Sequence, residues 1–598
     1  MKKRLRVIFA LVIIILIFFN ICDTAFACTL VYFGGAYTDD GANLFLRVED
    51  GDTNDENKLY IVSPAGQHKA GEEYLGCYGF KWNFTHDSYR YISRRDDNVI
   101  EPCPNCGSTH SHQPYEQAGT NEYGLTVSFT ESVDANSKIS KIDPYIVDGV
   151  SEADLTTILL SECSNASESL KLLKRLVETE GINTEGFAIV LCDQNEQWYV
   201  EALASHYFLA FQLSENLAFV NVNVSIIGLI DLDDENIICT DGLIELAKKA
   251  GTFIGDEDEN IIDYRRSISD YRVDLFNDDW KWNVFTRNAA SLNKLLNTNE
   301  FNADNVIEDN DYVITNISED GNIVPFYNKL KLKDTITLDY VIEFLRIYPI
   351  GSPQNIETHI YRFYPDEAPD FGTVEYSSFS SNQCNVFIPG YPILITDTWD
   401  GCKVGLPPTL YEAKDLDKWG HFGEASGVKV EPLKKDILDT NEYYIMLEDN
   451  AADTEFIDNA GLYHIFPEGW DKSYSYALNA FNNYLYYQAS DEERKLATGY
   501  YNDMQQDFNT RFEELSAELK EETDHSKRQE MMTGEHTSMY RESQETALAL
   551  FRHFKYGEEL PDSSGNYGFD LKYAVIVLCG AIVLSGIIYF YIKRDNRS

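Results

Sequence analysis

The chain has 598 residues, with 49 Lys and Arg against 98 Asp and Glu, which gives a formal charge of −49. Such an acidic balance argues against binding to nucleic acid or to anionic lipid headgroups, because both need clustered Lys and Arg. Hydrophobic residues make up 44% of the chain and aromatic residues 13%. That composition is typical of a globular protein and excludes a disordered one.

The first 27 residues have the three parts of an export signal. Basic residues crowd the first six positions, an unbroken apolar run covers 7–19, and small residues stand at Ala25 and Ala27. Cleavage is therefore predicted before Cys28. Two alternatives stay open. An uncleaved anchor is disfavoured because the apolar run is shorter than the ~20 residues of a membrane span. Lipidation of Cys28 is disfavoured by Phe26 and Ala25, which fit a lipoprotein signal poorly.

From residue 28 to about 470 the pattern mixes strands and helices without a strict alternation, which predicts an α+β fold. Segments rich in β-branched and aromatic residues predict strands at 29–33, 124–129, 186–191 and 198–203. Apolar residues at helical spacing predict one helix over 153–178. No internal repeat is evident.

After about residue 471 the pattern becomes helical. Apolar residues step by three or four from Tyr501 to Leu519, and a second helix is predicted over 538–554. We expect this apolar stripe to pack on the body of the protein; a groove-binding helix for a partner is the alternative. Residues 557–572 are typical of a flexible stalk.

Residues 573–592 contain no charge, and at ~1.5 Å per residue a helix of this length spans about 30 Å, the thickness of a hydrocarbon core. Lys593 and Arg594 follow directly, which predicts a cytoplasmic tail at 593–598 and an external N-terminal part. The prediction is therefore a single-pass protein of the cell membrane.

Cleavage before Cys28 would place a thiol and a free α-amine on one residue. An α-amine has a pKa of about 7.7–8, so part of it is neutral near pH 7–8 and can accept the thiol proton. A terminal nucleophile with its own amine is a known route of activation. No Cys–His pair stands out as an alternative.

Seven blocks follow Cys28 in order: C-T at 28–29, D-G at 40–41, R-V-E-D at 47–50, T-N-E-Y-G-L at 120–125, A-I-V-L-C-D at 188–193 with E-Q-W-Y-V-E at 196–201, V-N-V-S-I-I-G at 222–228, and P-G-Y at 389–391. Together they resemble peptidase family C69, the N-terminal-nucleophile dipeptidases. The resemblance covers residues 28 to about 400. It implies a four-layer αββα sandwich and amide hydrolysis without a cofactor.

The resemblance also implies roles for single residues. Cys28 would be the nucleophile, Arg47 the arginine beside it, and Asp50 the aspartate that orients the terminal amine. Asn121 and Asn223 would lie near the oxyanion. The clan's second arginine has three candidates: Arg265, Arg266 and Arg287. Without the resemblance, Arg47 and Asp50 would be interpreted as a surface ion pair, and residues 121–124 as a turn before a strand.

One segment departs from the family pattern. Cys103, Cys106, His110 and His112 lie between two of the matching blocks. They can form a compact zinc knuckle or, outside the cell, a disulfide or a reduced dithiol. The spacing to the histidines is short for a standard finger, so no metal is predicted.

The sequence thus predicts a signal at 1–27, a catalytic domain at 28–470, a helical region at 471–556, a stalk at 557–572, a transmembrane helix at 573–592 and a tail. The predicted function is cysteine-type hydrolysis of dipeptides or short peptides. The alternatives are a bile-salt or penicillin-type amide hydrolase of the same clan and a non-catalytic surface binding protein. Side-chain preference and oligomeric state, including a homo-oligomer, stay open.

Overall fold

The computed structural model describes residues 28–51, 58–96, 114–131, 134–183, 186–270, 278–302, 305–306, 313–318, 320–332, 334–405, 410–412, 455–457, 463–465 and 469–560. The predicted signal, the Cys103-to-His112 segment, the end of the predicted stalk and residues 573–598 lie outside these ranges. Among the helices within them, none is long and apolar enough to cross a membrane.

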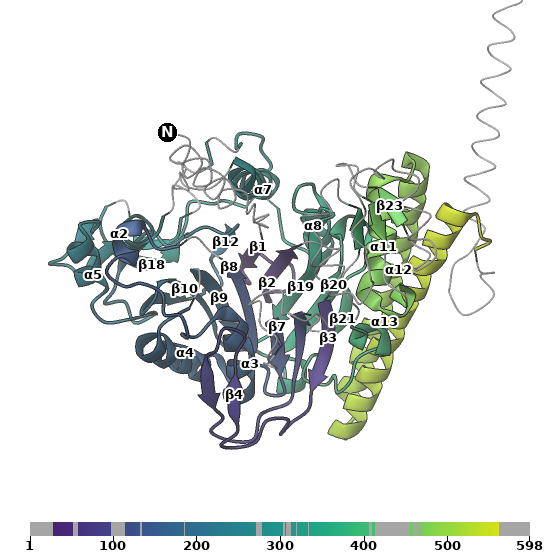
Figure 1. The fold of residues 1–598 in the computed structure, drawn as a ribbon, viewed down its shortest axis with the longest axis horizontal. Helices are drawn as coiled ribbons and strands as arrows, with labels where there is room; N and C mark the ends of the chain where they lie inside the picture. The colour runs from purple at the N-terminus through teal and green to yellow at the C-terminus, as the bar shows by residue number, and fades with distance from the viewer. Residues whose placement is uncertain are drawn as a thin grey trace, which may run out of the picture.

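Two antiparallel sheets form the body of the molecule (Figure 1). The first sheet has the strand order β12 (Ala218–Asn221), β1 (Thr29–Phe33), β2 (Asn43–Asp50), β19 (Asn355–Phe363), β20 (Thr373–Phe379), β21 (Ile388–Gly390). The second has the order β14 (Ile237–Cys239), β11 (Tyr207–Gln212), β10 (Gln197–Ala204), β9 (Phe187–Cys192), β8 (Thr126–Glu131), β7 (Glu116–Asn121), β6 (Tyr91–Asp96), β3 (Lys58–Ser63). The four predicted strands are β1, β8, β9 and β10.

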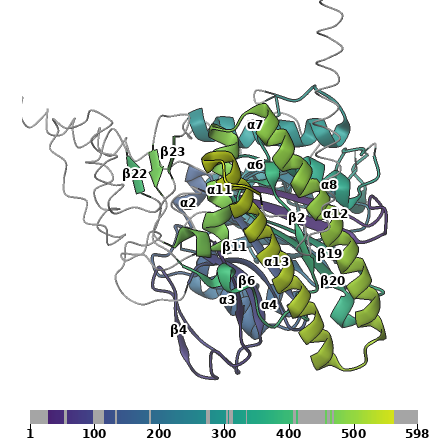
Figure 2. The same ribbon diagram turned by 90° about the vertical axis from the view of Figure 1, so that its right-hand side faces the viewer.

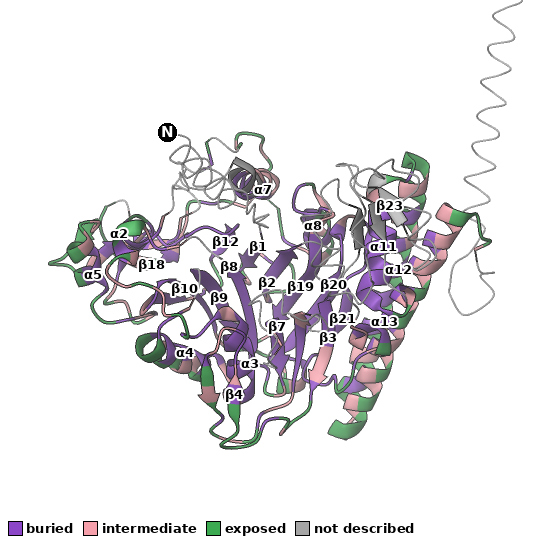
Figure 3. Cartoon of the chain, in the orientation of Figure 1, coloured by how far each residue is buried: buried purple, intermediate pink, exposed green. Residues whose placement is uncertain are grey.

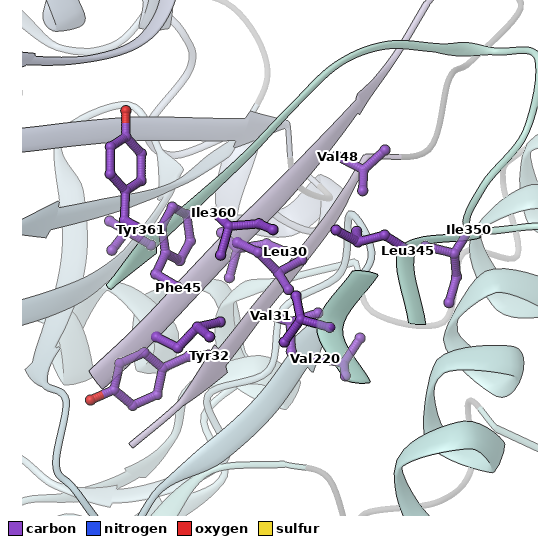
Figure 4. Close-up of a cluster of buried hydrophobic side chains, with 14 of the residues drawn as sticks. Leu30, Val31, Tyr32, Phe45, Val48, Val220, Leu345, Ile350, Ile360 and Tyr361 are labelled. Atoms are coloured by element: carbon purple, nitrogen blue, oxygen red, sulfur yellow. The ribbon is translucent and has the colours of Figure 1, made fainter. Parts of the chain in front are cut away.

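Helices cover the outer faces of both sheets. Helices α3 (Glu152–Glu162) and α4 (Ala166–Glu180) pack on the second sheet. On the first sheet, Val31, Val48 and Val220 form a buried cluster with Leu345 of α8 (Leu338–Arg346) (Figure 4). The layer order is therefore helix, sheet, sheet, helix, in an α+β fold as predicted.

The single helix predicted over 153–178 is wrong in one respect. The chain forms two helices there, α3 and α4, separated by Cys163 to Asn165. The side chain of Asn165 accepts a hydrogen bond from the backbone N–H of Glu168 and so begins a new helix. The apolar spacing continues across the break, which is why periodicity alone did not reveal it.

Smaller elements connect these layers. They are β4 (Glu73–Leu75), β5 (Lys81–Asn83), α2 (Ser137–Ser140), β13 (Leu229–Asp231), α5 (Leu243–Ala250), β15 (Gly255–Asp256), β16 (Ile261–Asp263), α6 (Tyr264–Ile268), α7 (Asp278–Leu296), β17 (Thr315–Ile317), β18 (Ile323–Tyr327), β22 (Leu410–Glu412), β23 (Glu455–Ile457), β24 (Tyr463–Ile465), and the short 3-10 helices η1 (Pro369–Phe371), η2 (Asn382–Cys384), η3 (Asp400–Lys403) and η4 (Trp470–Lys472).

Strand β2 is buried on both faces (Figure 3). Alternate side chains of a strand point to opposite faces, so Leu44, Leu46 and Val48 share one face and Arg47 and Glu49 the other. The apolar face belongs to the core under the helices. The charged face lies between the sheets, where Arg47 and Glu357 of β19 form an ion pair. The fold thus places charged groups in its interior.

Three helices form a layer beside one edge of both sheets: α11 (Tyr474–Tyr487), α12 (Asp491–Glu521) and α13 (His525–Tyr556) (Figure 2). The predicted apolar stripe lies in α12, and Tyr501, Met504 and Phe508 on it are buried. The expectation that this stripe packs on the body is confirmed, since it is occupied within the chain itself.

The helical layer also makes hydrogen bonds at one edge of each sheet. Ser475 donates a hydrogen bond to the carbonyl oxygen of Lys58 in edge strand β3. Gln505 of α12 accepts a bond from the N–H of Phe387 (2.7 Å) and donates one to its carbonyl oxygen (2.9 Å), directly before edge strand β21. Unpaired N–H and C=O groups at a sheet edge can pair with a strand of another chain. These hydrogen bonds pair some of those groups within the chain.

Candidate active site

Cys28 lies at the head of β1 and is 6% exposed. Thr29 pairs with Val48 of β2, and Leu30 pairs with Asn221 of β12. Continued to Cys28, these registers place it between Glu49 on one side and Asn223 on the other. The residue therefore starts a central strand whose two neighbours carry polar groups.

Arg47 is the charged group next to the Cys28 sulfur. Its Nη2 is 3.4 Å from Cys28 Sγ and donates to Oε1 of Gln117 at 3.2 Å. Its Nη1 is 3.4 Å from Oε2 of Glu49 and 3.8 Å from Oε1 of Glu357. Each end of the guanidinium thus has its own partners, and one end is on the thiol.

The thiol is a weak acid in this setting. Burial raises the pKa of the Cys28 thiol to about 11, and the opposing effect of Arg47 is smaller. The carboxylates of Glu49 and Asp50 raise it further, while the backbone of Asp50 lowers it by a hydrogen bond. In the full chain the nitrogen of Cys28 is a peptide amide, so no α-amine is present to accept the proton.

Asp50 is fully enclosed at the end of β2. Its carboxylate accepts a hydrogen bond from Nδ2 of Asn355 at 2.7 Å and forms an ion pair with Arg287 of α7. Arg287 also donates to Oγ of Ser352 at 3.2 Å. Burial raises the pKa of Asp50 to about 6, even though Arg287 and Asn355 oppose the rise. Among the three candidates for a second arginine, the structure brings Arg287 to the site.

The other two candidates, Arg265 and Arg266, are both in α6. Arg265 is buried and its charge acts on Glu201 of β10, whereas Arg266 is exposed and pairs with Asp263 of its own N-terminal cap. The interpretation of Arg47 and Asp50 as a surface ion pair is also wrong. Both side chains are buried, and each has a different partner of opposite charge.

Asn223 lies in the loop after β12 with a backbone φ of +49°, a left-handed conformation that asparagine tolerates better than most residues. Glu201 of β10 fixes this loop. It accepts hydrogen bonds from the N–H of Ile226 at 2.7 Å and from Oγ of Ser225 at 2.6 Å. Burial raises the pKa of Glu201 to about 7. The loop therefore has a defined shape beside Cys28.

Asn121 ends β7, and the structure places it in a turn. Both of its amide hydrogens are used, by the carbonyl oxygens of Leu160 (3.0 Å) and Cys163 (2.7 Å). Its oxygen accepts from the N–H groups of Tyr123 and Leu125. An oxyanion needs a donor, and this side chain has none left. The geometry thus corresponds to the turn and gives no support to the expected role at the oxyanion.

Metal ligation has no candidate in the described ranges, where no group of three or more His, Cys, Asp and Glu side chains comes together. Free thiols in those ranges include the side chains of Cys163, Cys192, Cys239, Cys384 and Cys402. The question of a knuckle or a disulfide at 103–112 falls on residues outside those ranges.

Comparison with known proteins fits this geometry. The model of peptidase family C69 matches residues 27–402, which includes Cys28, Arg47, Asp50 and every residue that contacts them. The chain belongs to peptidase family C69. The helical layer of α11–α13 follows the matched region.

Named relatives are probable dipeptidases. A probable dipeptidase B of Streptococcus pyogenes serotype M1 is 28% identical over 390 residues, which cover 63% of this chain and 74% of that protein. A probable dipeptidase of Salmonella dublin is 28% identical over 229 residues, or 38% of this chain and 50% of that protein. The chain therefore spans between half and three quarters of these two relatives.

Solved structures are more distant. Penicillin V acylase from Agrobacterium tumefaciens has a TM-score of 0.27 at 13% identity, covering 62% of this chain and 87% of that one. A variant of conjugated bile acid hydrolase from Clostridium perfringens has a TM-score of 0.26 at 12% identity, covering 59% and 89%. Scores this low support no argument about substrate.

Proposed function

We propose that the protein is a cysteine-type dipeptidase with an N-terminal nucleophile, Cys28, on an αββα sandwich of the N-terminal-nucleophile kind. The observation that supports this most is the position of Cys28 Sγ, 3.4 Å from Arg47 at the head of a central strand. The family match and the names of the relatives support peptide hydrolysis.

Removal of residues 1–27 is the activating step in this proposal. A thiol with a pKa of about 11 is protonated at neutral pH and needs a base. The α-amine released at Cys28, with an ordinary pKa of about 7.7–8, is that base. Asp50, held by Arg287 and Asn355, orients the amine.

The reaction then runs in two halves. The amine takes the thiol proton, and the sulfur attacks the carbonyl carbon of the peptide bond. The tetrahedral oxyanion collapses as the ammonium gives its proton to the leaving amine, which leaves a thioester on Cys28. Water, deprotonated by the amine, cleaves the thioester and releases the acid. Asn223, in the loop after β12, is the proposed side-chain donor to the oxyanion.

We further propose that the protein is exported and held in the cell membrane, with its catalytic part outside. The order of basic, apolar and small residues in 1–27 and the uncharged segment 573–592 with Lys593 and Arg594 behind it support this. Protease treatment of intact cells tests it. Loss of the catalytic part with retention of a short tail fragment is expected; full protection contradicts the orientation.

The test of function is a substrate panel with the mature protein and its Cys28→Ala variant. Dipeptides are expected to be cleaved by the first and not by the second, with both proteins folded. Cleavage of conjugated bile salts or penicillin V in place of dipeptides would transfer the assignment to an acyl-amide hydrolase. An inert Cys28 in a correctly cleaved protein would indicate a surface binding protein.

A further inference from the structure

Glu357 of β19 is a fully buried carboxylate that meets three groups at once. Its Oε1 is 2.7 Å from Nδ1 of His359 and 3.8 Å from Nη1 of Arg47, and its Oε2 is 3.1 Å from Nε of Arg94. Neither family motif nor periodicity marks this residue. It reaches the site because β19 pairs with β2, opposite Glu49.

A guanidinium is planar and rigid, so the place of one end determines the place of the other. Nη2 of Arg47 is the end on Cys28 Sγ, and Nη1 is the end between Glu49 and Glu357. Glu49 and Glu357 lie on neighbouring strands and hold Nη1 from two directions. With Glu357 absent, Nη1 would have Glu49 as its remaining carboxylate.

Glu49 alone would not hold the same position. It also pairs with Lys58 at 2.8 Å, and burial raises its pKa despite Lys58 and Arg47. Burial likewise disfavours charge on Glu357, yet His359, Arg94 and Arg47 bring the pKa of that carboxyl below its ordinary value. Glu49 thus divides its two oxygens between Lys58 and Arg47, whereas Glu357 is held by His359, Arg94 and Arg47 together.

We propose that Glu357 is a positioning residue that holds Arg47 so that its Nη2 stays on the Cys28 thiol. The proposal rests on the proposed function of Cys28. Arg94 and His359 in turn hold Glu357. His359 is neutral at pH 7, because burial lowers its pKa to about 4, so it donates through Nδ1 to Glu357 and accepts through Nε2 from Oγ of Ser128.

Ser128, His359 and Glu357 also have the hydrogen-bond order of a serine hydrolase triad. Ser128 and His359 are both 0% exposed. A nucleophile must reach substrate, so this array supports Glu357 and is not a second active centre. Ser128→Ala is therefore expected to retain most of the turnover of the mature enzyme.

The direction in which Glu357→Gln shifts the pKa of the Cys28 thiol decides between a positioning role and a purely electrostatic one. Removing an anion near Cys28 by Glu357→Gln would by itself favour the thiolate and lower the thiol pKa. Loss of the Arg47 contact would have the opposite effect and raise it. The proposal predicts a rise, measured as the pH profile of Cys28 alkylation by iodoacetamide in the mature full chain.

Glu375→Gln is the matched control. Glu375 is an equally buried acid that pairs with Arg94 and accepts a hydrogen bond from Tyr60. Among the ion pairs of the described residues, it makes none with Arg47. Both substitutions neutralise one acid of Arg94. Only Glu357→Gln is expected to shift the alkylation profile upward and to lower kcat on the order of 100-fold with little change in KM.

Equal effects of the two substitutions, or a downward shift with Glu357→Gln, would overturn the proposal. If Glu357→Gln does not fold, Glu357→Asp keeps the charge and withdraws the carboxylate; an upward shift supports positioning, and an unchanged profile refutes it. Alkylation needs no substrate. If the wild-type protein cleaves no dipeptide but Glu357→Gln still raises the pKa of Cys28 alkylation, the proposed function fails and the positioning role remains supported.

Discussion

The two faces of strand β2 are both buried, but one carries aliphatic side chains and the other carries a pair of charged ones. Leu44, Leu46 and Val48 face the helices, whereas Arg47 and Glu49 face the second sheet. Burying the first set is favourable, at roughly 25 cal/mol per Å² of apolar surface. Burying the second set costs desolvation that ion pairing only partly offsets. We infer that the apolar face supplies stability and that the charged face is retained for chemistry at Cys28.

The largest predicted effect lies at the head of the neighbouring strand. Cys28→Ala is expected to lower kcat for dipeptides on the order of 10⁵-fold, as when other covalent nucleophiles are removed. Its thermal unfolding is expected to stay close to that of the wild type, because the change removes one sulfur atom. Turnover that survives the substitution would show that the chemistry lies elsewhere.

Asp50 is the last residue of β2 and by the same alternation lies on the face of Leu46 and Val48, where it pairs with Arg287 of α7. Asp50→Asn keeps the shape but removes the anion that orients the amine, so kcat is expected to fall about 100-fold, within the usual contribution of proton transfer. Steady-state kinetics with a dipeptide measures this. A change in KM alone would assign Asp50 to substrate binding instead.

The same substitution makes a prediction about pH and stability. Because the folded pKa of Asp50 is raised to about 6, its contribution to stability is largest at low pH and declines as pH rises from about 4 to 6. Two pKa units correspond to roughly 3 kcal/mol. Urea unfolding of both proteins at pH 4 and pH 7 should show Asp50→Asn gaining that amount relative to wild type; a constant difference contradicts the raised pKa.

Leu46 gives the converse result on the apolar face. Leu46→Ala is expected to reduce the free energy of unfolding by about 3 kcal/mol, because a fully buried leucine leaves a cavity. Activity per folded molecule should remain within about twofold, in line with an independent site. Denaturant titration and active-site titration together check this, and a large loss of kcat would show that the two faces are coupled.

The smallest effect concerns the helical layer. Gln505→Ala removes both hydrogen bonds to Phe387 and leaves buried backbone groups unpaired, which should cost about 2 kcal/mol. Kinetic constants of the folded enzyme are expected to be unchanged. Hydrogen exchange should localise the loosening to the edge at β21; exchange that rises throughout the molecule would mean that the layer supports the whole fold.

The sequence revealed the part of the site that is close in the chain. Cys28, Arg47 and Asp50 lie on two adjacent strands joined by a short connection, so a local motif contains all three. Gln117, Arg287, Asn355 and Glu357 arrive through sheet pairing and helix packing over long separations, and no local pattern encodes such contacts. The polar residues of β19 gave no sign of function until its pairing with β2 was known.

Two differences between expectation and structure have local causes. Asn121 matched a family block, but asparagine is also a common turn residue, and here the turn takes all of its hydrogen-bonding groups. The break between α3 and α4 was hidden because apolar spacing persists through it. The capping residue Asn165 was the available signal.

The central claim is that Cys28 becomes a free terminal nucleophile. It is tested most directly by mass spectrometry of the N-terminus of active protein purified from a secreting host. We predict a chain that begins at an unmodified Cys28. An active protein that begins upstream, or one whose Cys28 carries a lipid, would contradict the account.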